Sequence, residues 1–114
     1  MENEFKNIEL LVSKSKVDEA EIQLSKFGSE YYRDSDYLYL RSKIFYLKKL
    51  YYICIDTMLI ALEFKEDDRY YELLSNVYNI LGNTELSKKF LDSKIRLKTV
   101  NSLKDELSGI YREN

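Results

Sequence analysis

Few side chains in this sequence of 114 residues could do catalytic chemistry. It has no histidine, which removes Ser-His and Cys-His nucleophile pairs and imidazole metal sites. Its three glycines are too scattered to form a loop that cradles phosphate. Cys54 is the one candidate nucleophile, and we interpret it as a small core residue because internal alignment of the chain puts it in one column with Ala20 and Ser87. We therefore expect no enzyme, no cofactor and no metal site.

Carboxylates cluster at Glu63, Glu66, Asp67 and Asp68. Such a cluster could bind a hard cation, but its spacing matches no calcium loop and it lacks the glycine that such loops need. We interpret it as a solvated loop. Asp67 or Asp68 can then cap the helix that follows.

Cations gather in the segment 88–98, where only Asp92 offsets them. These are Lys88, Lys89, Lys94, Arg96 and Lys98. A basic helix of this kind could bind an acidic partner or RNA. No aromatic side chains alternate with the cations, as a stacking platform for bases would need, so we interpret the segment as a solvated helix face and keep nucleic-acid binding as an alternative.

Charge and hydropathy limit the remaining classes. Eighteen basic and twenty acidic residues give a net charge of −2, which argues against binding to nucleic acid or a membrane surface through bulk charge. A single cysteine excludes an intramolecular disulfide and fits a reducing compartment. No apolar stretch approaches the roughly 20 residues that span a bilayer, and the first residues carry glutamates where a signal peptide would be apolar. We expect one cytoplasmic domain, residues 1–114.

The segment 68–98 predicts two amphipathic helices joined by a tight turn at Gly82 and Asn83. The apolar residues of the first recur at helical spacing, and those of the second form another stripe. The two sets are Tyr71, Leu74, Tyr78 and Leu81, then Leu86, Phe90, Leu91 and Ile95.

Similar pairs occur at offsets of 34 and then 33 residues, which divides the chain into repeats at about 1–34, 35–67 and 68–101. Four columns stay in phase: Leu11, Phe45 and Tyr78; Val17, Tyr51 and Thr84; Ala20, Cys54 and Ser87; Leu24, Met58 and Leu91. Ser15, with Asp18 three residues on, predicts an N-cap for the second helix. In repeat two, a one-residue shift that turns Tyr37 and Leu40 inward remains an open alternative.

The third repeat resembles the tetratricopeptide repeat family, whose pattern has a small residue at positions 8 and 20, an aromatic at 11 and glycine at 15. Ser75, Ser87, Tyr78 and Gly82 fill these slots. Ile8 at position 8 and Arg41 at position 7 depart from the pattern. The resemblance implies an all-α, right-handed helical repeat array of three helix pairs. A capping helix at 102–112 would complete seven helices, with one apolar face made of Leu103, Leu107, Ile110 and Tyr111.

In that family the first helix of each repeat lines a concave groove that binds a peptide or helix. The resemblance implies the groove residues Phe5, Glu9, Val12, Tyr39, Lys43, Tyr46, Leu47, Arg69, Glu72, Asn76, Asn79 and Ile80. Only Arg69 matches the charges with which chaperone-binding members hold a partner's terminal carboxylate. We therefore expect a protein–protein interaction module, adaptor or assembly subunit. A homodimerising structural subunit and nucleic-acid binding through 88–98 are the alternatives.

Overall fold

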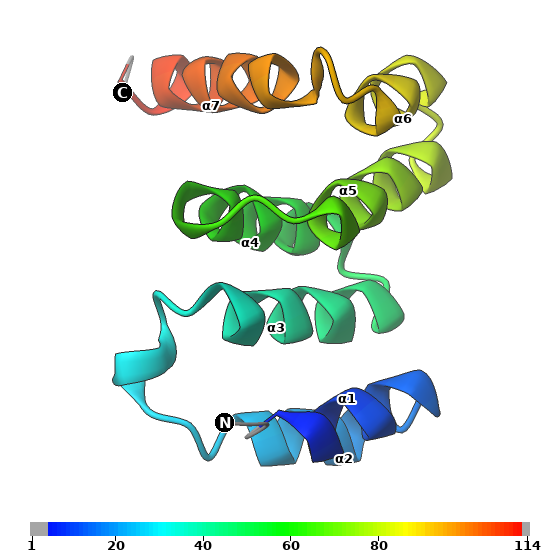
Figure 1. Cartoon of the computed structure of the whole chain (residues 1–114), viewed down its shortest axis with the longest axis vertical. Helices are drawn as coiled ribbons and strands as arrows, with labels where there is room; N and C mark the ends of the chain where they lie inside the picture. The colour runs from blue at the N-terminus through cyan, green and yellow to red at the C-terminus, as the bar shows by residue number, and fades with distance from the viewer. Residues whose placement is uncertain (1–4, 113–114) are drawn as a thin grey trace. The chain divides into compact units, whose positions relative to one another are not determined.

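The computed structural model describes the backbone of residues 5–112 and the side chains of residues 5–106. Regular structure in this range is entirely helical, which confirms the predicted all-α class and its seven α-helices (Figure 1). The helices form two compact units, Met1–Glu66 and Asp67–Asn114. In chain order the elements are α1 (Lys6–Ser13), α2 (Val17–Leu24), the 3-10 helix η1 (Ser29–Tyr31), α3 (Ser35–Leu47), α4 (Tyr51–Phe64), α5 (Asp68–Ile80), α6 (Thr84–Leu91) and α7 (Arg96–Arg112).

In the first unit, α1 packs on α2 and α3 packs on α4, and both α1 and α2 contact α3. Ala20 on α2 and Cys54 on α4 are both 0% exposed. Because these side chains are small, the two helices of each pair can approach closely. An aromatic cluster covers the connection from α2 to α3. In it the Phe27 ring lies 5.0 Å from Phe5 and 4.8 Å from Tyr31, between ring centroids.

The second unit is built from α5 packed on α6 and α6 packed on α7. The Tyr78 ring of α5 stacks on the Phe90 ring of α6 with centroids 5.6 Å apart, and Phe90 is fully buried. Val100 of α7 is buried as well. The predicted helical pair in 68–98 is therefore present, although its second helix is shorter than expected.

Three inter-helix turns share one backbone conformation. Among residues 5–112, positive φ values occur at Ser15 (59°), Lys49 (63°) and Gly82 (87°), each in the turn that joins the helices of a pair. The following N–H bonds five residues back, which makes each turn a Schellman motif. The three bonds are Lys16 N to Leu11 O at 2.9 Å, Leu50 N to Phe45 O at 2.9 Å, and Asn83 N to Tyr78 O at 2.8 Å.

This turn corrects the prediction that Ser15 caps α2. In the left-handed conformation Ser15 ends α1 rather than starting the next helix, and the N-cap position of α2 is Lys16. No side chain caps α2 there. The helix itself begins at Val17.

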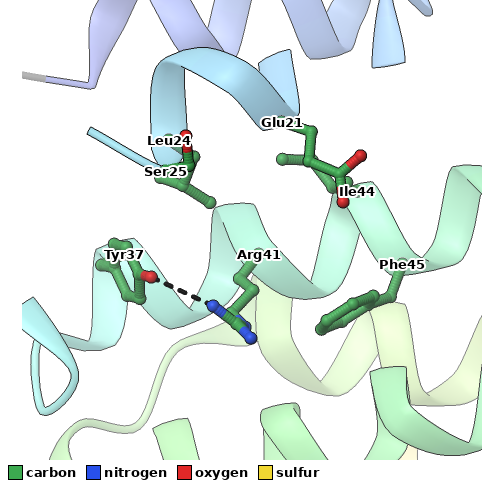
Figure 2. Close-up of a pocket in the computed structure, with 7 residues that line it drawn as sticks. All are labelled: Glu21, Leu24, Ser25, Tyr37, Arg41, Ile44 and Phe45. Atoms are coloured by element: carbon green, nitrogen blue, oxygen red, sulfur yellow. Dashed lines mark hydrogen bonds between the residues drawn. The ribbon is translucent and has the colours of Figure 1, made fainter. Parts of the chain in front are cut away.

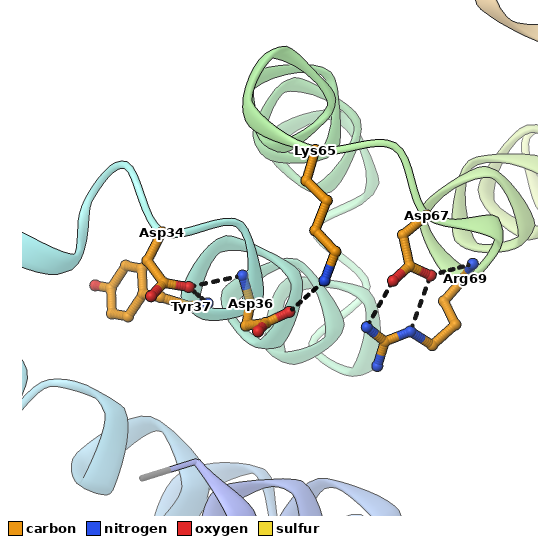
Figure 3. A network of polar contacts seen from close by, with 6 residues as sticks. All are labelled: Asp34, Asp36, Tyr37, Lys65, Asp67 and Arg69. Atoms are coloured by element: carbon orange, nitrogen blue, oxygen red, sulfur yellow. Dashed lines mark hydrogen bonds and ion pairs between the residues drawn. The ribbon is translucent and has the colours of Figure 1, made fainter. Parts of the chain in front are cut away.

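Aspartates start α3 and α5 (Figure 3). Asp34 accepts from Asp36 N at 2.9 Å and Tyr37 N at 3.2 Å, and Asp67 accepts from Arg69 N at 2.9 Å. The prediction that Asp67 or Asp68 caps the first helix of the third repeat is confirmed, with Asp67 as the N-cap of α5. In α3, Tyr37 and Leu40 are 2% and 3% exposed, so both side chains lie inward as the alternative for repeat two predicted, while Ser42 at the unshifted position 8 is buried as well.

The predicted continuous helix at 88–98 is wrong, because α6 ends at Leu91 and α7 begins at Arg96. Asp92 Oδ1 accepts the Lys94 N–H at 2.9 Å, and this local turn competes with helix continuation. Leu91, expected to be inward, is 60% exposed. The last helix starts six residues before the predicted capping helix at 102, and the predicted face residues Leu107, Ile110 and Tyr111 lie outside the described side chains.

Candidate partner-binding surface

One face of α3 carries four of the predicted groove residues. Tyr39, Lys43, Tyr46 and Leu47 follow the spacing i, i+4, i+7 and i+8, which places them on one side of the helix, and each is half-buried. Lys43 Nζ lies 5.8 Å from the centroid of the Tyr39 ring. The Tyr46 ring meets Tyr51 of α4 edge to face at 6.0 Å. We call these four residues the α3 face.

The three predicted groove residues at the start of the chain have different environments. Glu9 of α1 is exposed, whereas Val12 of α1 is buried and presents almost no surface to a partner. Phe5 is half-buried and packs edge-on against Tyr31 at 5.9 Å as well as against Phe27. Phe5 thus closes an aromatic cluster of the first unit.

On α5 all five predicted groove residues are exposed. Helical spacing puts them on one side of the helix, away from its buried residues. These exposed residues are Arg69, Glu72, Asn76, Asn79 and Ile80. We call them the α5 face; it combines amides, two charges of opposite sign and one large apolar side chain.

Arg69 forms an ion pair with Asp67, the residue that caps α5. Its Nε and Nη2 atoms donate to the two carboxylate oxygens of Asp67 at 3.0 and 2.9 Å, a bidentate pair (Figure 3). The guanidinium also lies 5.9 Å from the Tyr70 ring centroid. Arg69 therefore presents a charge already paired with Asp67. In the first unit, Lys65 and Asp36 form a separate ion pair at 3.7 Å.

A hollow of about 160 Å³ lies between α2 and α3 in the first unit (Figure 2). Arg41 lines it and lies along α3, donating from Nη1 to the Tyr37 hydroxyl at 3.1 Å, and its guanidinium carbon lies 5.4 Å from the Phe45 ring centroid. Glu21 lines the same hollow and is paired with Lys48 at 3.0 Å.

The sequence prediction missed this hollow because Arg41 was considered only as a departure at position 7 of the repeat. Tyr37, Arg41 and Phe45 are spaced four residues apart, which places an aromatic ring one helical turn to either side of a guanidinium. That spacing is the signal that could have found the site.

The cations of 88–98 divide between two helices and a turn. Arg96 Nη1 lies 2.9 Å from Asp68 Oδ1, and its guanidinium carbon lies 4.2 Å from the centroid of the Tyr71 ring. Its charge is therefore paired within the second unit. Lys89 and Lys98 line a groove of about 480 Å³ between α6 and α7, together with apolar side chains. The apolar lining residues are Leu86, Ile95 and Leu103.

Cys54 is buried, as predicted for a small residue at a helix–helix contact. Burial raises the pKa of its thiol from 9.0 to about 12, with Lys43 opposing the shift.

Across the side chains that the structure describes, no three cysteine or carboxylate groups are placed to hold a metal ion. Within the same range, no helix has both the length and the apolar character needed to cross a membrane.

Comparison with models of protein families, with curated proteins and with solved structures found no match to this chain.

Proposed function

We propose that this chain is a tetratricopeptide-like repeat protein without enzymatic activity, and that it binds another protein through the first helices of its repeats. The partner segment would be a peptide or helix with apolar anchors. In the first unit, the α3 face supplies the contacts to these anchors. In the second unit, the α5 face offers a polar surface of its own.

The repeat part of the proposal is supported by the three Schellman turns. Their left-handed residues, Ser15, Lys49 and Gly82, are 34 and 33 residues apart, which matches the spacing of the sequence columns. A non-glycine residue adopts this conformation at a cost of about 1–2 kcal/mol, so local preference alone does not explain it at Ser15 and Lys49. The same turn at the same register favours one repeated helix-pair unit.

The binding part of the proposal rests on one observation: two tyrosines and a leucine are held half-buried along one side of α3. Side chains in this state are already ordered by their neighbours, as Tyr46 is by Tyr51, yet still offer surface to a partner. Binding energy at protein interfaces concentrates in such anchors, with tyrosine enriched among them. Tyr39 and Tyr46 are therefore the expected anchors, with Leu47 beside them.

Affinity capture with paired variants tests this proposal. The immobilised protein is compared with Tyr39→Ala/Tyr46→Ala and with Tyr52→Ala, a matched tyrosine truncation on α4, and captured proteins are quantified by mass spectrometry. We expect at least one protein to be lost with the double variant and retained with Tyr52→Ala. The double variant should melt cooperatively, with a loss of about 1–3 kcal/mol, because both rings are only half-buried. Equal capture by all three proteins, or an unfolded double variant, would contradict this role for the α3 face.

A further inference from the structure

The hollow between α2 and α3 contains a positive charge that no carboxylate among the described side chains pairs with. Arg41 donates to the Tyr37 hydroxyl at 3.1 Å, and its guanidinium carbon lies over the Phe45 ring, 5.4 Å from the centroid (Figure 2). Glu21 lines the same hollow, but both of its oxygens accept from Lys48 Nζ instead, at 3.0 and 3.1 Å. A guanidinium has five N–H donors in a fixed fork, so most of those of Arg41 remain for a ligand.

The Tyr37 hydroxyl is a second donor at the same place. Its side chain is only 2% exposed, and the hydroxyl oxygen accepts the hydrogen bond from Arg41. The hydroxyl proton has no acceptor among the residues that the structure describes. A hydroxyl carries one proton to donate, so this proton is available to an oxygen atom that enters the hollow. Because the two donor groups are in contact, one carboxylate can bond to both.

The rest of the hollow is small and largely apolar. Leu24 and Ile44 are buried, and their side chains line it together with the Phe45 ring. Its volume of about 160 Å³ is close to that of an engineered protein cavity, about 150 Å³, that holds one benzene molecule. An inorganic anion gains nothing from apolar walls, and the Glu21 carboxylate disfavours a ligand with more than one negative charge. The volume and the lining therefore favour a small organic acid with a single carboxylate.

We propose that this hollow binds a small organic monocarboxylate, whose oxygens accept hydrogen bonds from Arg41 and the Tyr37 hydroxyl and whose apolar part packs on the apolar walls. Every residue that lines the hollow belongs to the first unit, so the donors and the walls all come from that unit. Arg41 lies on the opposite side of α3 from Lys43, because two residues correspond to about 200° around a helix. The site is therefore separate from the α3 face.

An NMR titration of the full chain with benzoate tests the inference, because benzoate joins one carboxylate to a ring of the size that the hollow can hold. The backbone amide signals of Arg41 and Phe45 should shift saturably at millimolar benzoate. Two control ligands separate the parts of the site. Benzamide keeps the ring without the charge, inorganic phosphate has charge without an apolar part, and each should bind about tenfold or more weakly than benzoate. Equal binding of either control, or no saturable shift with benzoate, would overturn the proposal.

Variants locate the binding. Arg41→Gln should weaken benzoate binding about tenfold or more, because it removes the charge and the fork of donors. Arg33→Gln is the matched control, since it changes an exposed arginine elsewhere in the first unit, and it should leave binding unchanged. Tyr37→Phe should weaken binding severalfold, because it removes only the hydroxyl donor. If Arg41→Gln fails to fold, Tyr37→Phe takes its place.

Two outcomes would overturn the assignment. The first is that Arg33→Gln weakens benzoate binding as much as Arg41→Gln does, because binding would then follow net charge alone. The second is that Arg41→Gln and Tyr37→Phe both melt cooperatively and both bind benzoate with unchanged affinity, because benzoate would then be bound elsewhere on the chain.

Discussion

The hydroxyl of Ser75 on α5 lies 2.8 Å from the hydroxyl of Ser87 on α6 and donates to the Ser87 carbonyl oxygen at 2.9 Å. Since Ser75 has one proton to donate, the Ser87 hydroxyl donates to Ser75. These residues hold positions 8 and 20 of the third repeat, where the two helices approach closely. The same positions of repeat two hold Ser42 and Cys54, both fully buried, and Ser42 Oγ has no hydrogen-bond partner among the described residues.

Ser75→Ala should therefore lower the free energy of unfolding by about 1–3 kcal/mol, because it leaves the buried Ser87 hydroxyl without its partner. Ser42→Ala is the matched control. It removes a buried hydroxyl without a hydrogen-bond partner in the described part of the chain, so stability should stay the same or rise by up to about 1 kcal/mol. Urea unfolding of both variants measures the difference, and an equal loss in the two would contradict the hydrogen-bond account.

The left-handed turns predict opposite effects for two substitutions. Gly82→Ala should destabilise by about 1–2 kcal/mol, because alanine disfavours the φ of 87° although a Cβ there would meet no atom within 4 Å. Lys49→Gly should stabilise by up to about 1 kcal/mol, since glycine relieves strain but adds freedom to the unfolded chain. Thermal melting should show a fall for the first and a small rise for the second. A rise for Gly82→Ala would refute the turn assignment.

Cys54 should resist thiol reagents in the native protein at pH 8, because its side chain is inaccessible and its pKa is raised to about 12. Urea should expose it to rapid labelling. Cys54→Ala should be tolerated, whereas Cys54→Leu should cost about 1–3 kcal/mol by overpacking. Rapid labelling of the folded protein would show that repeat two is packed differently.

The same thiol makes stability depend on alkaline pH. Because the folded pKa is raised, the unfolded chain loses the Cys54 proton first, and stability falls as pH rises from about 9 toward 12. The limiting slope is about 1.4 kcal/mol per pH unit. The stability of the native sequence relative to Cys54→Ala isolates this slope from tyrosine ionisation, and a difference that does not change with pH would contradict it.

Arg96 connects α7 to α5 within the second unit through Asp68 and the Tyr71 ring. Arg96→Ala should lower stability by about 1–2 kcal/mol through lost stacking and lost side-chain packing. Arg96→Lys should recover only part of this, because an ammonium lacks the planar face that stacks on tyrosine. Full recovery of the melting temperature by Arg96→Lys would mean that the positive charge alone, and not the planar face of Arg96, stabilises the contact.

Helix positions were predictable where they depend on repeated apolar and small residues. Val17, Tyr51 and Thr84, which form one sequence column, are the first residues of α2, α4 and α6. The end of α6 was not predictable from periodicity. Leu91 and Ile95 continue the apolar spacing, but Asp92 between them has an extended backbone and its side chain accepts the Lys94 N–H at 2.9 Å.

The candidate sites were predictable only in part. The resemblance to tetratricopeptide repeats placed Tyr39, Lys43, Tyr46 and Leu47 on one side of the helix, but could not indicate that Val12 is buried or that Phe5 packs on Phe27. Both depend on tertiary packing around α1.

Site-specific photo-crosslinking tests the central claim most directly. A benzophenone amino acid replaces Tyr46 on the α3 face or, in a matched control, Ile22, which is 59% exposed on α2. After irradiation in extract from the native host, we predict a discrete cross-linked adduct with another protein from position 46 and none from position 22, with both proteins folded. Adducts from position 22 alone, or none from a folded protein labelled at position 46, would contradict partner binding at the α3 face.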